Sequence, residues 1–190
     1  MTGIPAQYER VEVASERALW DWLAANHAQE KGVILVTWKA ATRDKYVGRE
    51  AVLDALVAHG WIDGRRYKLD EARTAQLITP RQTQSWAASY KARAARLEAE
   101  GRMHKAGRAR IRAAKASGSW TDMADVDALR APDDLVQALG AACQVWEGLA
   151  PSYRRNVLRW IKSARTAPTR DKRIAAAAKA TKSGEKLAQM

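Results

Sequence analysis

Strand-forming sequence is confined to the first 80 residues of this chain, which restricts the folds it can adopt. The strand-like runs are residues 11–13, 33–38, 61–69 and 73–79. Beyond them, apolar side chains recur at helical spacing, and Pro132, Pro151 and Pro168 stand where helices begin. The pattern predicts an α+β fold, in which helices pack on a small antiparallel sheet and an all-helical C-terminal module follows.

Changes in composition divide the 190 residues into one main domain with an appendage. We expect a lead-in at 1–10, an α+β domain at 11–120, a linker at 121–131, a helical module at 132–175 and a frayed Ala/Lys tail at 176–190. Within the α+β domain, the sequence predicts that Val33–Trp38 is a strand buried on both faces. Gly60 is expected to end a helix, and Gly64 is expected to mark a bulge.

The chain has features of a protein outside the secretory pathway. Its single cysteine, Cys143, excludes a disulfide scaffold. The longest uncharged stretch is far shorter than the ~20 apolar residues of a membrane span. The N-terminal residues lack the apolar core of a secretory signal. We therefore expect a cytoplasmic protein with no membrane span.

Basic side chains are concentrated in two segments of the chain. The formal net charge is +12, of which residues 81–115 carry +8 and residues 151–190 carry +9, whereas residues 116–150 carry −5. Two interpretations fit this distribution. The basic segments form a surface that binds an anion such as nucleic acid, or they pair with the acidic segment inside the molecule.

A candidate pocket for an anionic or polar ligand surrounds the sequence Gly60–Gly64. Its predicted residues are Trp61, Asp63, Arg65, Arg81 and Trp86. The carboxylate of Asp63 is suited to acid–base chemistry, the guanidinium of Arg81 to holding an anion, and the tryptophans to forming an aromatic wall. The alternative is structural, because aspartate beside glycine is common in turns and Arg81 is a suitable ion-pair partner for Asp63.

A second candidate is a nucleic-acid surface on the basic helices expected within residues 91–115 and 154–173. Its residues are Lys91, Arg108, Arg112, Lys115, Arg155, Arg159 and Lys162. Basic side chains interleaved with aromatic ones hold phosphates and stack bases, and Trp86, Trp120 and Trp160 lie in or beside these segments. Core packing is the competing interpretation, since Trp86 and Trp160 fall on apolar helical stripes.

The sequence predicts neither a metal site nor a cofactor site. His27, His59 and His104 are far apart along the chain and lack the spacing of metal ligands. We expect His27 and His59 to lie at the C-terminal ends of helices, where the helix dipole favours a cation. No phosphate-binding loop or dinucleotide fingerprint is present in the sequence. These features favour a binding protein over an enzyme.

Several motifs along the chain resemble those of a known bacterial family. They are Trp22–His27, Val33–Lys39, Gly60–Gly64, Thr79–Arg81, Ser85–Trp86, Glu100–Met103, Trp146–Arg155, Trp160–Ile161 and Thr169–Ile174. In order and spacing they are similar to the YdeI/OmpD-associated family, also labelled bacteriocin-protection proteins. The resemblance covers about residues 11–175. One departure is Ala87–Ser89, where the family pattern places an asparagine after the Ser-Trp pair.

The resemblance implies an α+β N-terminal domain, distantly similar to the YdhG-like, frataxin-resembling group, and a helical C-terminal module. It implies a non-enzymatic binding protein related to stress or antimicrobial protection, with an unknown anionic or polar ligand. Two alternatives stay open, namely weak nucleic-acid binding by the basic segments and an enzyme with a pocket around Asp63. The exposed face of the helical module is expected to pack either on the N-terminal domain or on a protein partner.

Overall fold

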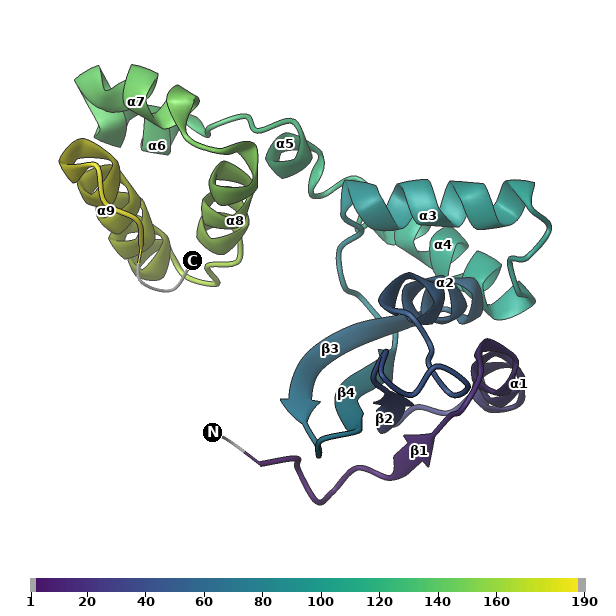
Figure 1. Cartoon of the computed structure of the whole chain (residues 1–190). Coiled ribbons are helices and arrows are strands. Elements are labelled where there is room, and N and C mark those ends of the chain that lie inside the picture. The colour runs from purple at the N-terminus through teal and green to yellow at the C-terminus, as the bar shows by residue number, and fades with distance from the viewer. Residues whose placement is uncertain (1–2, 188–190) are drawn as a thin grey trace. The chain divides into compact units, whose positions relative to one another are not determined.

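The computed structural model describes residues 3–187 and divides the chain into two compact units, Met1–Thr121 and Asp122–Met190 (Figure 1). The first unit combines a sheet with helices, and the described part of the second unit is helical. The predicted α+β class with a helical C-terminal region is confirmed.

One four-stranded sheet, in the order β1-β2-β4-β3, forms the described strand layer of the first unit. Its strands are β1 Arg10–Glu12, β2 Val33–Trp38, β3 Trp61–Lys68 and β4 Arg73–Pro80. β4 pairs antiparallel with both β2 and β3, but β1 runs parallel to β2. The sheet is therefore mixed rather than antiparallel throughout. A parallel pair needs a crossover connection, which helix α1 (Glu16–Asn26) supplies between β1 and β2.

Two local predictions for the strands are confirmed. β2 is buried along almost its whole length, because both faces of its apolar run are covered. The pairing of β3 with β4 shifts register between Asp63 and Arg66, which places an irregularity next to Gly64. The turn after β3 is closed by Asp70, whose carboxylate accepts a hydrogen bond from the backbone N–H of Arg73.

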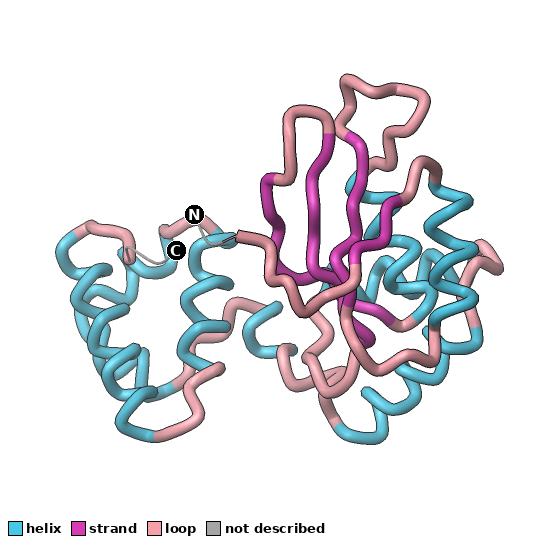
Figure 2. Tube along the Cα trace, turned by 90° about the horizontal axis from the view of Figure 1, so that it is seen from below, coloured by secondary structure: helices cyan, strands magenta, loops and turns pink. Residues whose placement is uncertain are grey.

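The helices of the first unit form two tiers beside the strand layer. Helix α2 (Arg49–His59) contacts β3, and it also contacts α3 (Ala88–Ala99) and α4 (Lys105–Ser117). Figure 1 shows α2 between the strands and these two helices, and Figure 2 shows the strands as a layer of their own. Gly60 ends α2 in the left-handed conformation, with a φ of 76°, as predicted. Helix α3 begins at Ala88.

The close packing of α2 on α4 depends on Gly107. A Cβ atom at this position would lie 2.2 Å from the carbonyl oxygen of Ala58 and 2.7 Å from the Sδ of Met103. The backbone N–H of His104 also donates to the carbonyl of Ala58, with an N···O distance of 3.1 Å. The end of α2 and the beginning of α4 are therefore fixed against each other backbone to backbone, which positions the outer helices.

The second unit packs helices around an apolar core. Its helices are α5 Ala124–Asp127, α6 Asp133–Leu139, η1 Gly140–Ala142, α7 Cys143–Gly148, α8 Pro151–Lys162 and α9 Ala167–Ser183. Leu135, Leu139, Trp146, Val157 and Ile161 are buried together in its core. Among the described residues of the whole chain, no helix is long and apolar enough to cross a membrane.

Two expectations for this part of the chain are wrong. Residues 121–131 are not only a linker, because they contain α5, whose Val126 is buried in the core of the second unit. The tail is not frayed from residue 176, because α9 continues to Ser183 and buries Ala177 and Ala178 in the same core. Both segments are ordered by contacts with helices that are distant in the sequence. A short segment with few large apolar residues does not predict such contacts.

Candidate functional site

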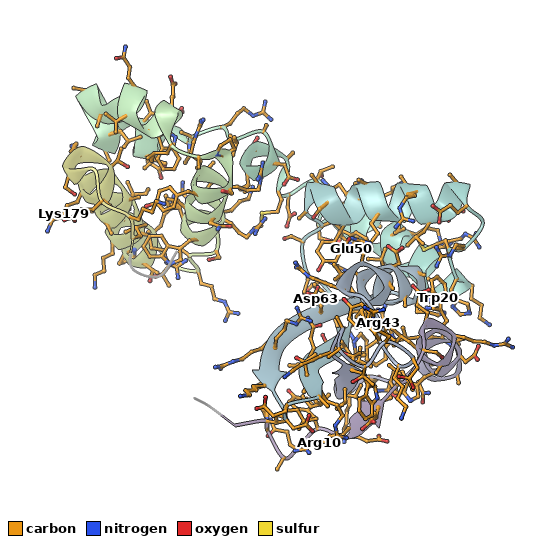
Figure 3. All side chains as sticks on the ribbon, viewed as in Figure 1. Arg10, Trp20, Arg43, Glu50, Asp63 and Lys179 are labelled. Carbon is orange, nitrogen blue, oxygen red and sulfur yellow. The ribbon has the colours of Figure 1, made fainter. Side chains whose placement is uncertain are left out.

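The five residues of the predicted ligand pocket do not share one open surface. Trp61 and Trp86 are 0% and 1% exposed and belong to two different core clusters. Arg65 is exposed on β3. Asp63 lies on the same strand and is labelled in Figure 3, and Arg81 follows β4 directly. Of the five, Arg81 contacts Trp86 directly, and Asp63 is joined to Arg81 through a residue that the sequence did not indicate.

That residue is Tyr90 of α3. Its hydroxyl donates a hydrogen bond to the carboxylate of Asp63, which also accepts one of 3.3 Å from the side-chain amide of Gln76. The guanidinium carbon of Arg81 lies 5.1 Å from the centre of the Tyr90 ring and 4.2 Å from that of Trp86. The hydrogen bond from Tyr90 therefore connects the sheet to α3, and cation–π contacts join Arg81 to Tyr90 and to Trp86, which precedes α3.

Arg81 is enclosed in this cluster, with 1% of its surface exposed. Its Nη1 donates to the backbone carbonyls of Gln84 and Ser85, at 3.2 and 3.1 Å. Burial lowers the pKa of Arg81, and nearby Tyr90 and Asp63 offset part of that effect. Burial and the hydrogen bond to Asp63 raise the pKa of Tyr90 far above its ordinary value. The buried guanidinium supports the structural interpretation of this cluster over an open anion site.

A groove of about 360 Å³ lies between α3 and α4. Its lining residues are Lys91, Ala94, Ala95, Glu98, Arg108, Ile111, Arg112, Lys115 and Trp120. They include every residue of the predicted nucleic-acid surface that belongs to the first unit. Ala94, Ile111 and the half-buried Trp120 supply its apolar part, and charged side chains surround them.

Positive charge in this groove gathers around the indole of Trp120. The ammonium groups of Lys91 and Lys115 lie 5.8 and 5.4 Å from its ring centre. Arg108 forms an ion pair with Glu98, with an Nε···Oε1 distance of 2.9 Å. Within residues 3–187, neither Arg112 nor Lys115 forms an ion pair. The groove therefore presents cations beside a fixed aromatic ring.

Other cations of the same basic segment have a structural role. Arg93 and Arg96 of α3 both donate hydrogen bonds to the carboxylate of Asp54 on α2, and Arg93 also donates to Glu50. Burial alone would raise the pKa of Asp54, but the hydrogen bonds from Arg96 and Arg93 lower it below its ordinary value. These ion pairs connect α3 to α2. Some basic side chains of residues 81–115 therefore form internal ion pairs, and others line the groove.

The remaining residues of the predicted nucleic-acid surface lie on α8 of the second unit. They are Arg155, Arg159 and Lys162. Arg159 and Lys162 are exposed, whereas Val157 and Ile161 of the same helix are buried. Trp160 is half-buried against the core of this unit. The core-packing interpretation is therefore confirmed for Trp160, as it is for Trp86 in the first unit.

The structure brings the three histidines together, although they are far apart in the sequence. The ring centres of His27 and His59 each lie 4.9 Å from that of His104. His27 and His59 stand at the C-terminal ends of α1 and α2, as predicted, and the Nδ1 of His104 accepts the backbone N–H of Ala106 at the start of α4. Burial lowers the pKa of His59, and the neighbouring His104 and His27 add to this. The pKa of His104 is lowered by burial, then by His27 and by Lys105.

This cluster is not arranged as a metal site. Among the described residues, no group of three or more His, Cys, Asp or Glu side chains is placed to hold a metal ion. The single cysteine, Cys143, is a partly exposed free thiol. The contact of three imidazoles left no signal in the sequence, because it depends on how α1, α2 and α4 pack.

In a comparison with known protein families, the two parts of the chain match different family models. Residues 11–110 match the family model described as a domain of unknown function (DUF8412). Residues 128–184 match the model described as "Bacteriocin-protection, YdeI or OmpD-Associated". No significant match was found among curated proteins or among solved structures.

These matches correct the resemblance inferred from the sequence motifs. The YdeI/OmpD-associated resemblance is supported for the C-terminal part, within residues 128–184. The expected likeness of the N-terminal part to the YdhG-like, frataxin-resembling group is not supported, since that part matches a different family. The chain therefore belongs to the DUF8412 family, and its C-terminal part matches the bacteriocin-protection, YdeI or OmpD-associated family.

Proposed function

We propose that this protein is a non-catalytic binding protein with a role in protection against antimicrobial agents, and that its ligand is an anion bound in the α3–α4 groove. The match of residues 128–184 to the bacteriocin-protection model supports the protective role. The groove supports the ligand class. The cytoplasmic location expected from the N-terminal sequence stays a prediction.

One observation carries the proposal, namely the excess of positive charge lining the groove. Among the residues that the structure describes, four basic side chains line it, and Glu98 is the one acidic residue in the lining. Glu98 pairs with Arg108, which leaves Arg112 and Lys115 of the same helix without an ion pair among the described residues. A concave surface lined by one sign of charge concentrates ligands of the opposite sign.

The enzymatic alternative around Asp63 has less support. Both oxygens of the Asp63 carboxylate accept hydrogen bonds, one from Tyr90 and the other from Gln76. A general acid or base must reach the proton of a bound substrate, and here the carboxylate already has internal donors. The buried Arg81 beside it is likewise held by backbone carbonyls.

The proposal is tested by titrating the full chain with inorganic tripolyphosphate in a calorimeter at low and physiological salt. The double variant Arg112→Gln/Lys115→Gln removes two exposed cations three residues apart. The matched control, Arg159→Gln/Lys162→Gln, removes two exposed cations with the same spacing on α8.

We expect measurable binding that weakens with salt, because phosphate contacts release counterions. The groove variant should weaken binding about tenfold and the α8 control less than about twofold, in line with about 1.4 kcal/mol per factor of ten. Absence of binding at low salt would overturn the proposal. An equal loss in both double variants would also overturn it, because binding would then follow net charge and not the groove.

A further inference from the structure

We infer that the groove takes a single-stranded nucleic acid, with an unpaired base stacked on the indole of Trp120 and its phosphates held by the groove's cations. This inference rests on the proposed function, because it names the ligand class of the same groove. It makes Trp120, and not the total charge, the feature that selects the ligand.

Trp120 is built as a rigid platform. Its backbone N–H donates to the carbonyl of Ala114, at 3.1 Å, which fixes the chain after α4. Its ring centre lies 5.0 Å from that of the buried Trp86, and the two ring planes are inclined by 45°. Part of the indole nevertheless remains exposed and lines the groove. An immobile, partly exposed aromatic ring loses little side-chain entropy when a base stacks on it.

The cations of α4 are arranged as a track that leads to this platform. Arg108, Arg112 and Lys115 follow one another at intervals of four and three residues, which places them on one face of the helix, and Arg108 at the far end is the one that pairs with Glu98. With a rise of 1.5 Å per residue, the track is about 10 Å long. Lys91 of α3 also lies near the indole, 5.8 Å from the ring centre. A short stretch of sugar–phosphate backbone fits such a track, with a base directed to the exposed part of the Trp120 ring.

The apolar part of the groove distinguishes this ligand from a bare polyphosphate. Ala94, Ile111 and Trp120 would add nothing to the binding of an inorganic anion, whereas they cover the flat face and edge of a base. The volume of about 360 Å³ is near the lower end of the range of small-ligand pockets, about 300–1,000 Å³. A duplex is excluded from this mode of binding, because its bases are stacked on one another and offer no free face.

The test compares three probes on the full chain at one low salt concentration. They are a single-stranded thymidine 12-mer, an abasic 12-mer with the same number of phosphates, and a duplex of the same length. Base stacking on an aromatic side chain corresponds to a factor of about 5 to 150 in affinity per base. We expect the thymidine 12-mer to bind at least about tenfold more tightly than the abasic 12-mer, and the duplex to bind no better than the abasic strand.

Variants of Trp120 then assign the difference to the ring. Trp120→Leu should reduce the affinity for thymidine about tenfold or more and leave the abasic strand unchanged, whereas Trp120→Phe, which keeps an aromatic face, should retain most of the difference. The matched control is Trp160→Leu, another half-buried tryptophan, which should change neither affinity. Thermal unfolding of each variant by circular dichroism identifies any loss of the fold, and the phenylalanine variant keeps the test valid if leucine is not tolerated.

The outcomes separate this inference from the proposed function. Equal binding of the thymidine and abasic strands, or tight duplex binding, would overturn the nucleic-acid inference and leave the anion groove in place. An unchanged thymidine affinity in both Trp120 variants would do the same. Failure of all three probes and of tripolyphosphate to bind would overturn both.

Discussion

The contact of three histidines predicts that the first unit loses stability in mild acid. His59 is 3% exposed, and burial lowers its pKa below the ordinary 6.5. The half-buried His104 also has a lowered pKa, with Lys105 and Arg108 adding positive charge beside it. Protonated His104 would in addition place a charge at the N-terminus of α4, where the helix dipole is already positive, and would lose the acceptor of the Ala106 N–H.

The sign follows from the direction of these shifts. As pH falls through 6.5, His59 and His104 bind protons in the unfolded chain but remain mostly neutral in the folded chain. Folding therefore becomes less favourable. The stabilising contribution is complete above this pH and is lost as pH falls toward the lowered pKa values of His59 and His104. Each such proton changes the free energy of unfolding by at most about 1.4 kcal/mol per pH unit. Because the unfolded chain is only half protonated at pH 6.5, the loss between pH 6.5 and 5.5 is at most about 1 kcal/mol per histidine, and we expect buried His59 to contribute more than the partly exposed His104.

Urea unfolding at pH 7.5, 6.5 and 5.5, followed by circular dichroism, measures this slope. The variant His104→Asn keeps a side-chain acceptor at the start of α4 and removes the titrating ring. It should have a shallower slope, because it also removes the repulsion between His104 and His59. A free energy of unfolding that stays constant from pH 7.5 to 5.5 in the unaltered protein would refute the reasoning.

Two further predictions concern packing and the buried cluster of the first unit. Gly107→Ala should lower the free energy of unfolding by about 2 kcal/mol, because the clash with the carbonyl of Ala58 exceeds the gain of about 1 kcal/mol in helix propensity. Gly148→Ala, in a helix with open space around it, should be neutral or stabilising in the same urea titration, and equal effects would contradict this account. Tyr90→Phe should cost about 2 kcal/mol, the range for a hydrogen bond to a charged group, and a change below about 0.5 kcal/mol would show that the bond to Asp63 contributes little.

Local sequence signals identified much of the first unit. The apolar, β-branched run at 33–38 is a buried strand, and Gly60 ends α2 because glycine alone adopts its positive φ without strain. The parallel pairing of β1 with β2 could not be predicted from local signals, because a strand of three residues, Arg10–Glu12, is too short for its pattern to indicate the strand direction. The same holds for α5, which is ordered by burial of Val126 and not by its own propensity.

Only the part of the candidate site that depends on local spacing could be predicted from the sequence. The spacing of Arg108, Arg112 and Lys115 places three cations on one helix face from local geometry alone. Their relation to Trp120 depends on the reversal of the chain at Gly118, whose φ is 81°, and on the packing of α3 beside α4. Arg81 was predicted at an open pocket and is buried, because only the folded chain encloses it between aromatic rings.

Hydrogen–deuterium exchange of the full chain with and without the thymidine 12-mer tests the central claim most directly, because it reports where the ligand lies. The account predicts slower exchange in backbone amides within residues 91–120, the segment that contains the lining residues of the groove. The amides of α8, at 151–162, should exchange at the same rate in both samples. Protection of α8 without protection of 91–120 would contradict the claim that the α3–α4 groove is the binding site.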